Sequence, residues 1–162
     1  MNQGIVPTTE DRADASATAR GGKYLGFSLG KQLFGVEILR VREIVCGLVI
    51  TPVPRANHAV RGVINLRGKI IPVVDLRLSF GMDAVVQDDR TCFIVVDAVR
   101  GGAETQIGVL VDAVSEVLTI PESDIEPPPR LGTMDAASMR GIAKVKGAVR
   151  MLLDIDVAIG GV

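Results

Sequence analysis

An internal repeat limits what this chain can fold into. Residues 34–45 resemble residues 107–118, and residues 62–76 resemble residues 141–155, in the same order along the chain. The matched positions include glycines and acids as well as apolar residues: Gly35 with Gly108, Val36 with Val109, Val41 with Val114, Glu43 with Glu116, Gly62 with Gly141, Gly68 with Gly147, and Asp75 with Asp154. Two ordered matches of this kind favour duplication over chance similarity between valine-rich strands. We therefore expect two similar lobes of about 65 to 70 residues, each marginally stable alone.

The repeated segments have the composition of β-strands. Hydrophobic residues make up 48% of the chain but aromatic residues only 3%, so the core must consist mainly of Val, Ile and Leu, which pack well in sheets. Paired strands are predicted at residues 24–29 with 33–38, 60–66 with 69–74, 91–99 with 106–111, and 141–145 with 148–153. Short strands need closure to protect their edges, so each lobe is predicted to be a small barrel.

The segments between the strands carry helix, loop and tail signals. Asp75 is a predicted N-cap for a short helix at residues 76–80, and residues 154–159 are predicted to form another. Residues 37–45 fit either a short helix or the start of a strand. The prolines at 127–129 predict a stiff loop, where we place the extra length of the second half. Residues 1–22 lack an apolar period, which predicts a disordered tail before a domain at 23–160.

Charge and cysteine content narrow the class of function. A net charge of −1 and five aromatic residues argue against a nucleic-acid binder, which needs basic or stacking side chains. Cys46 and Cys92 lie in apolar runs, so we interpret them as small, buried hydrophobic residues that stay reduced. The N-terminus has no signal-peptide pattern, and no apolar run reaches membrane-spanning length. The protein is therefore predicted to be soluble and cytoplasmic.

Residues that carry chemistry are sparse. The single histidine, His58, lies in a polar, proline-flanked stretch without a neighbouring cysteine, so we interpret it as a solvated loop residue. Asp75 and Asp154 occupy equivalent positions in the repeat, which favours a shared capping role over a pair of catalytic acids. We expect no enzyme activity, no catalytic residue, no cofactor and no metal.

The sharpest local feature is Asn-Leu-Arg-Gly at residues 65–68. One interpretation is a plain hairpin turn with Arg67 in solvent. The other places Arg67 at a rigid strand end, where it engages a protein partner. Arginine suits that second role because its guanidinium binds carboxylates and its stem packs against a partner. The equivalent residue in the second half of the repeat is Lys146.

Around this motif the sequence resembles a known family. Residues 62–77, Gly-Val-Ile-Asn-Leu-Arg-Gly-Lys-Ile-Ile-Pro-Val-Val-Asp-Leu-Arg, are similar to the signature stretch of the CheW coupling proteins of bacterial chemosensory arrays. Residues 27–44, 50–54 and 107–118 are similar to other parts of that family, and the resemblance covers about residues 23–159. It implies a mainly β fold of two interleaved, SH3-like five-stranded β-barrel lobes around a joint hydrophobic core, with a few short helices and approximate repeats at 34–76 and 107–155.

The resemblance also implies an adaptor function. Proteins of this family couple methyl-accepting chemoreceptors to the histidine kinase CheA, whose regulatory domain is homologous to them. The implied receptor-binding residues are Val41, Glu43, Gly62, Val63, Arg67 and Val117, and the implied kinase-binding residues are Ile38, Leu39 and Arg42. We expect Glu43 and Arg67 to form a surface ion pair that fixes the receptor-facing groove.

Two other functions remain open at this point. One is coupling in a non-flagellar chemosensory array, for twitching or surface sensing. The other is a small-molecule-binding double barrel, which requires a pocket where polar groups converge.

Overall fold

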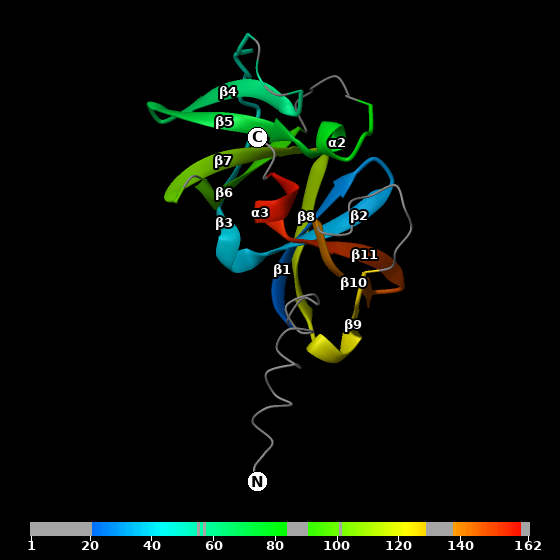
Figure 1. The fold of residues 1–162 in the computed structure, drawn as a ribbon. Coiled ribbons are helices and arrows are strands. Elements are labelled where there is room, and N and C mark those ends of the chain that lie inside the picture. Colours follow the sequence, from blue (N-terminus) through cyan, green and yellow to red (C-terminus); the bar gives the residue numbers. More distant parts are fainter. Residues whose placement is uncertain are drawn as a thin grey trace.

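The computed structural model describes residues 21–54, 56, 58–83, 91–100, 102–128 and 138–159. Residues 1–20, which hold most of the predicted tail, and Pro129 of the triproline loop lie outside this part of the chain. Within it the protein is mainly β, as predicted, with two sheets and a few short helical turns (Figure 1).

The strands divide between a six-stranded and a five-stranded sheet. The six-stranded sheet contains β1 (Gly22–Leu29), β2 (Gln32–Glu37), β8 (Ala113–Ile120), β9 (Ile125–Glu126), β10 (Met139–Val145) and β11 (Ala148–Leu153). The five-stranded sheet contains β3 (Val41–Cys46), β4 (Val60–Leu66), β5 (Lys69–Asp75), β6 (Cys92–Arg100) and β7 (Ala103–Val111). The helical turns are η1 (Ile38–Arg40), α2 (Leu76–Ser79), η2 (Glu122–Asp124) and α3 (Ile155–Ala158). We call the two parts of the molecule the Arg67 lobe, on the five-stranded sheet, and the Lys146 lobe, on the six-stranded sheet.

Strands that are equivalent in the repeat follow one another in the same order in both sheets, and the six-stranded sheet has β9 in addition. Each sheet contains strands from both halves of the repeat. The orders are β8-β1-β2-β11-β10-β9 and β3-β6-β7-β5-β4. The β1–β2 hairpin of the first half joins β11 in parallel, and the β6–β7 hairpin of the second half joins β5 in parallel. The halves have therefore exchanged hairpins. The β6–β7 hairpin runs further than the predicted strands at 91–99 and 106–111, since Arg100 pairs with Ala103.

Each sheet closes into a barrel through the segment that follows its first edge strand, β3 or β8. That segment crosses to the other edge of the sheet and pairs with the strand there, β4 or β10. In the Arg67 lobe, Thr51 and Val63 exchange two backbone hydrogen bonds of 2.8 and 2.9 Å. In the Lys146 lobe the two-residue strand β9, absent from the predicted strands, pairs with β10. Gly62 permits the first closure: its φ of 145° lies in the region that favours glycine, and an added Cβ would lie 2.1 Å from the Thr51 carbonyl oxygen.

The largest hydrophobic cluster lies between the lobes and takes residues from both sheets. Phe34 of β2 and Ile107 of β7, which are equivalent in the repeat, are both fully buried in it. Phe34 stacks between Phe27 and Phe80, with ring centroids 5.4 and 5.8 Å away. Two smaller clusters fill the individual barrels. The lobes thus share one core, in agreement with the implied fold. A barrel of this size is marginally stable alone, so a shared core stabilises both.

The predicted caps are confirmed on both short helices. The Asp75 side chain accepts a hydrogen bond from the Arg77 amide at 2.9 Å, and Asp154 accepts one from the Val157 amide at 3.3 Å. The ambiguous stretch 37–45 contains both alternatives in sequence, the 3₁₀ turn η1 and then strand β3.

The interpretation of the cysteines as reduced residues is wrong, and their predicted burial holds for Cys92 but not for Cys46. Cys46 ends β3, Cys92 begins β6, and the two are direct cross-strand partners joined by a disulfide, with Cα atoms 4.3 Å apart. Cys92 is buried, whereas Cys46 is exposed. The residues are 46 positions apart in sequence, so only the register between β3 and β6 brings them together.

Candidate protein-interaction surface

Arg67 and Gly68 form the two-residue turn between β4 and β5. Their φ angles of 52° and 85° are both positive, the pattern of a type I′ turn, which matches the twist of the flanking strands. The Asn65 side-chain oxygen also accepts a hydrogen bond from the Gly68 amide at 2.8 Å. Backbone and side chain together fix the turn, and they leave 71% of the Arg67 side chain exposed.

The predicted ion pair between Arg67 and Glu43 is present. The Arg67 guanidinium donates a hydrogen bond to Glu43 Oε1, and this bond raises the pKa of Arg67. Glu43 lies on β3, at the opposite edge of the sheet from β4. The pair therefore spans the seam where the barrel closes. Exposed ion pairs add little to stability, so the main consequence is an arginine held in one position while most of it remains accessible.

The Lys146 lobe has a matching pair. Lys146 and Gly147 form the β10–β11 turn with φ angles of 53° and 81°. The Lys146 ammonium donates a hydrogen bond to Glu116 of β8 at 2.7 Å, which lowers the pKa of Glu116. Turn and ion pair thus recur in both lobes, and the two tips differ in their cation.

The other implied receptor-binding residues fall into two groups. Val41 lies on β3 with Glu43, half-buried against the shared core, and Val63 lies on β4 within the Thr51 closure. Gly62 acts through the backbone, as described above. These residues belong to the same sheet as Arg67. Val117 does not: it lies on β8 at the edge of the other sheet, where 49% of it is exposed.

The implied kinase-binding residues lie on η1 and the start of β3. Ile38 packs against the shared core, whereas Leu39 is 90% exposed. Arg42 points outward from β3 and pairs with Asp97 at 3.5 Å. Leu39 is the large apolar side chain among the three that is free to contact a partner, because 90% of it is exposed.

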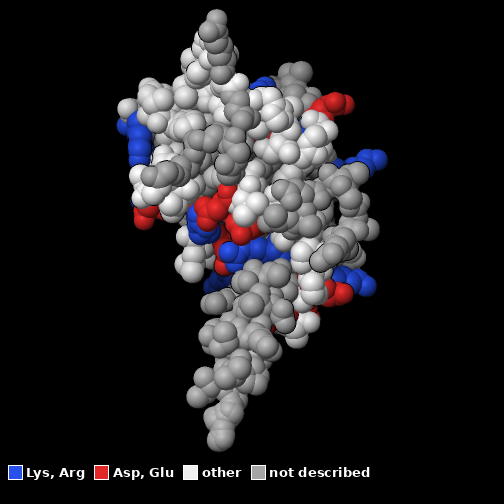
Figure 2. Space-filling view, in the orientation of Figure 1, with Lys and Arg blue, Asp and Glu red and all other residues white. Residues whose placement is uncertain are grey.

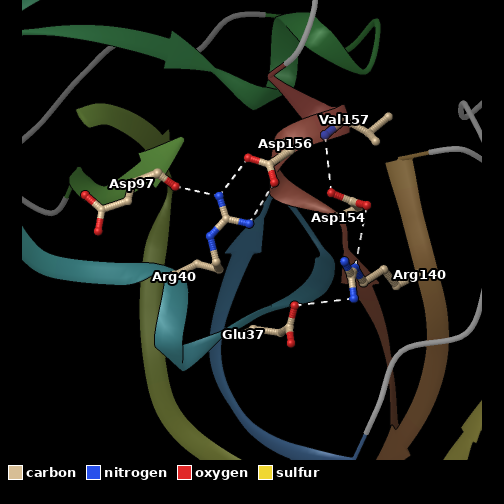
Figure 3. A network of polar contacts seen from close by, with 7 residues as sticks. All are labelled: Glu37, Arg40, Asp97, Arg140, Asp154, Asp156 and Val157. Atoms are coloured by element: carbon tan, nitrogen blue, oxygen red, sulfur yellow. Dashed lines mark hydrogen bonds and ion pairs between the residues drawn. The ribbon is translucent and has the colours of Figure 1, made fainter. Parts of the chain in front are cut away.

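A polar network at the junction of the lobes was not predicted. Arg40 of η1 donates hydrogen bonds of 2.8 and 2.7 Å to both carboxylate oxygens of Asp156 on α3, and one of 2.6 Å to the Asp97 carbonyl (Figure 3). Arg140 lies nearby, 3.5 Å from Glu37 and 3.6 Å from Asp154. The guanidinium of Arg40 lowers the pKa of Asp156. Acidic and basic side chains accordingly gather near the middle of the face in Figure 2.

A second junction pair has the reverse polarity. Arg77 of α2 holds both oxygens of Asp112, and the Gly30 amide donates a further hydrogen bond to the same carboxylate at 2.5 Å. Arg77 and Asp156 are equivalent in the repeat, one residue into α2 and α3 respectively. The one feature of the sequence that could have indicated these junction pairs is the presence of arginine at position 77 and aspartate at the equivalent position 156.

A shallow cavity of about 260 Å³ lies beside the network, lined by Leu39, Arg40, Asp97, Val99 and Asp156 among others. Two of its polar lining residues, Arg40 and Asp156, already pair with each other. Across the described ranges, no three His, Cys, Asp or Glu side chains are grouped so as to hold a metal ion. In the same part of the chain no helix is long and apolar enough to cross a membrane.

Comparisons with known proteins match this architecture. The family described as CheW-like domain matches residues 23–160. A chemotaxis protein CheW from Rhizobium meliloti is 36% identical, covering 86% of this chain and 88% of that protein, and protein FrzA from Myxococcus xanthus is 31% identical, covering 85% and 83%. The crystal structure of the scaffolding protein TtCheW from Thermoanaerobacter tengcongensis has a TM-score of 0.75 and 38% identity, covering 85% of this chain and 92% of that one. This chain therefore belongs to the CheW family of chemotaxis coupling proteins.

Proposed function

We propose that this protein couples methyl-accepting chemoreceptors to the histidine kinase CheA, with the Arg67 tip facing the receptor. One observation carries the proposal. Arg67 is fixed by a type I′ turn and by Glu43, yet it is 71% exposed. Interfaces favour such a preorganised arginine, because little side-chain entropy is lost when it binds.

The receptor-facing surface in this proposal consists of Arg67, Glu43, Val41 and Val63. The kinase-facing surface begins at Leu39, with Ile38 behind it and Arg42 beside it. Both surfaces adjoin β3, so one edge strand would connect the two partners. Gly62 contributes by allowing the closure that positions β4, and Val117 would extend the receptor surface onto the other lobe.

In this proposal the protein acts as an adaptor and catalyses no reaction. Coupling through two surfaces requires neither a cofactor nor a reacting group. Its place would be the cytoplasm, at the cytoplasmic tips of membrane receptors, where its partners hold it.

Charge reversal at Arg67 tests the receptor-facing surface. We expect Arg67→Glu to weaken binding to a receptor-tip fragment by about tenfold or more, because it removes a central arginine and places two like charges together. The melting temperature should stay nearly unchanged, since exposed pairs contribute little to stability. Isothermal titration calorimetry and thermal unfolding measure the two effects.

Lys146→Glu is the matched control, because it makes the same charge change at the equivalent turn. It should leave receptor binding unaffected. A large loss of thermal stability in Arg67→Glu, or an equal loss of binding in both variants, would show that Arg67 is a structural residue.

A second candidate is coupling in an array that does not control flagella. The similarity to protein FrzA, whose name differs from that of the chemotaxis relatives, favours this alternative over other functions. Deleting the gene and scoring swimming and surface motility separately distinguishes the two. Loss of swimming alone supports the first candidate, and loss of surface motility alone supports the second.

A further inference from the structure

The disulfide between Cys46 and Cys92 joins β3, an edge strand in the described sheet, to the neighbouring strand β6. β3 ends the strand order of its sheet, with β6 beside it. Cys46 is exposed, whereas Cys92 is only 9% exposed. Cys46 is therefore the half of the bond that lies nearer to solvent, while the sheet shelters Cys92.

The repeat shows that the fold does not need this bond. In the six-stranded sheet β8 takes the place of β3 and β1 takes the place of β6. The pair that corresponds to Cys46 and Cys92 there is Thr119 and Lys23. That ladder keeps the same pairing without a covalent link, so the crosslink is an addition to one lobe rather than a part of the shared architecture.

The bond lies at the end of the proposed partner-binding strand. Arg42, Ile44 and Cys46 form the exposed row of β3, and Glu43 of the ion pair is on the same strand. Directly after Cys46 the chain turns at Gly47, whose φ is 78°, and reaches Val49, which is 82% exposed. Val45, Leu48 and Ile50 pack against the cluster of this barrel, and β3 pairs with β6 up to Cys46. The disulfide therefore adds a covalent link at the point where the ladder ends and the exposed turn begins.

We propose that Cys46 and Cys92 form a reversible dithiol–disulfide site, exchanged by low-molecular-weight thiols and disulfides, that controls the order of β3 and of the partner surface on it. The bond closes β3 against β6 in the oxidised protein. In the reduced protein the ladder and the apolar contacts alone hold the end of β3 and the following turn, which open more often, while the rest of the fold persists. The effect on partner binding rests on the function proposed above, whereas the redox site itself does not.

Reduction of the Cys46–Cys92 disulfide consumes two molecules of a small thiol. A small thiolate attacks Sγ of Cys46, the more exposed of the two residues, and the Cys46–Cys92 bond breaks. Cys92 leaves as a thiolate and takes up a proton. A second small thiolate then attacks the small-molecule sulfur of the mixed disulfide and releases Cys46. Two electrons pass to the protein, and one small-molecule disulfide is formed; oxidation is the reverse.

Reduced and oxidised glutathione in varied ratio provide the test. Alkylation of free thiols, read by mass spectrometry, should convert from no label to two labels across the titration. On reduction, amide hydrogen exchange at residues 41–50 should accelerate by about tenfold, as expected for local opening. Residues 113–120, on the equivalent strand β8, should not change. Cys46→Ser should show the reduced pattern at every ratio.

Two results would overturn the redox site. One is a disulfide that glutathione does not reduce while the protein stays folded, and the other is an amide hydrogen-exchange rate at residues 41–50 that does not change on reduction. The regulatory part is tested with the CheA regulatory domain, which the oxidised protein should bind about fivefold or more tightly than the reduced one. Equal binding would refute that part. If exchange responds but neither form binds kinase or receptor fragments, the redox site stands and the proposed function fails.

Discussion

The two hairpin tips carry the same geometry with different chemistry. The φ angles at Arg67 and Lys146 differ by one degree, and each cation reaches a glutamate at an equivalent strand position. Asn65 supports the first turn, but the equivalent residue in the second is Lys144. Since the turn forms with or without that side chain, and with either cation, the turn belongs to the repeat. At this turn position only the Arg67 lobe has a guanidinium, because the other lobe has Lys146.

The junction pairs extend the comparison. Arg40–Asp156 and Arg77–Asp112 are both two-pronged contacts at the helical turns, with the cation and anion exchanged. Each lobe therefore has an ion pair near this junction, and the member on the short helix is Arg77 in one lobe and Asp156 in the other. Residues that recur identically, such as Asp75 and Asp154, mark the architecture. Residues that differ at equivalent positions are where the two lobes can differ in function.

The largest effect should come from the core that both lobes share. Phe34→Ala should destabilise the protein by about 3–5 kcal/mol, and Ile107→Val at the equivalent position by about 0.5–1.5 kcal/mol. Both side chains are 0% exposed in the same cluster, so either change should shift one cooperative transition in urea. If Phe34→Ala produced a second transition that left one lobe folded, the lobes would be independent and the joint core would not couple them.

The reversed junction pairs should differ in strength. Asp112→Asn should cost about 1–2 kcal/mol, because the carboxylate serves both Arg77 and the Gly30 amide. Asp156→Asn should cost about 0–1 kcal/mol, since Asp156 is 43% exposed and solvent screens its pair with Arg40. Urea midpoints of the two variants measure the difference. Equal losses would mean that burial and the number of partners do not set the contribution.

The same carboxylates should weaken the fold in acid. Hydrogen bonds from Arg77 and Arg40 lower the pKa of Asp112 and Asp156 respectively in the folded protein. Their contribution is therefore complete above the ordinary aspartate pKa near 3.9 and is lost as the pH falls through the lower folded values. Stability measured from about pH 6 to about pH 2 should fall less steeply in the double variant Asp112→Asn/Asp156→Asn than in the wild type. Parallel curves would exclude this linkage.

Local features could be read from the sequence, and long-range pairings could not. The caps at Asp75 and Asp154 depend on residues a few positions apart, and the Glu43–Arg67 pair followed from resemblance. The disulfide required the register of β3 on β6, which no short-range pattern encodes. The junction pair of Arg40 and Asp156 required the exchange of hairpins, because η1 and α3 come from opposite halves. The resemblance implied a role for Leu39 from its position in the sequence, but only the structure shows that its side chain is exposed.

The finest test exchanges the two cations. Lysine at position 67 should still pair with Glu43, because Lys146 already makes that contact with Glu116 at 2.7 Å. Arg67→Lys therefore keeps the turn, the charge and the ion pair, and removes only the planar fork. We expect it to weaken receptor-fragment binding by about tenfold, the loss of a hot-spot arginine, with an unchanged melting temperature. Lys146→Arg should alter neither quantity. If Arg67→Lys bound as tightly as the wild type, charge alone would suffice at this tip, and the two lobes would differ in position rather than in chemistry.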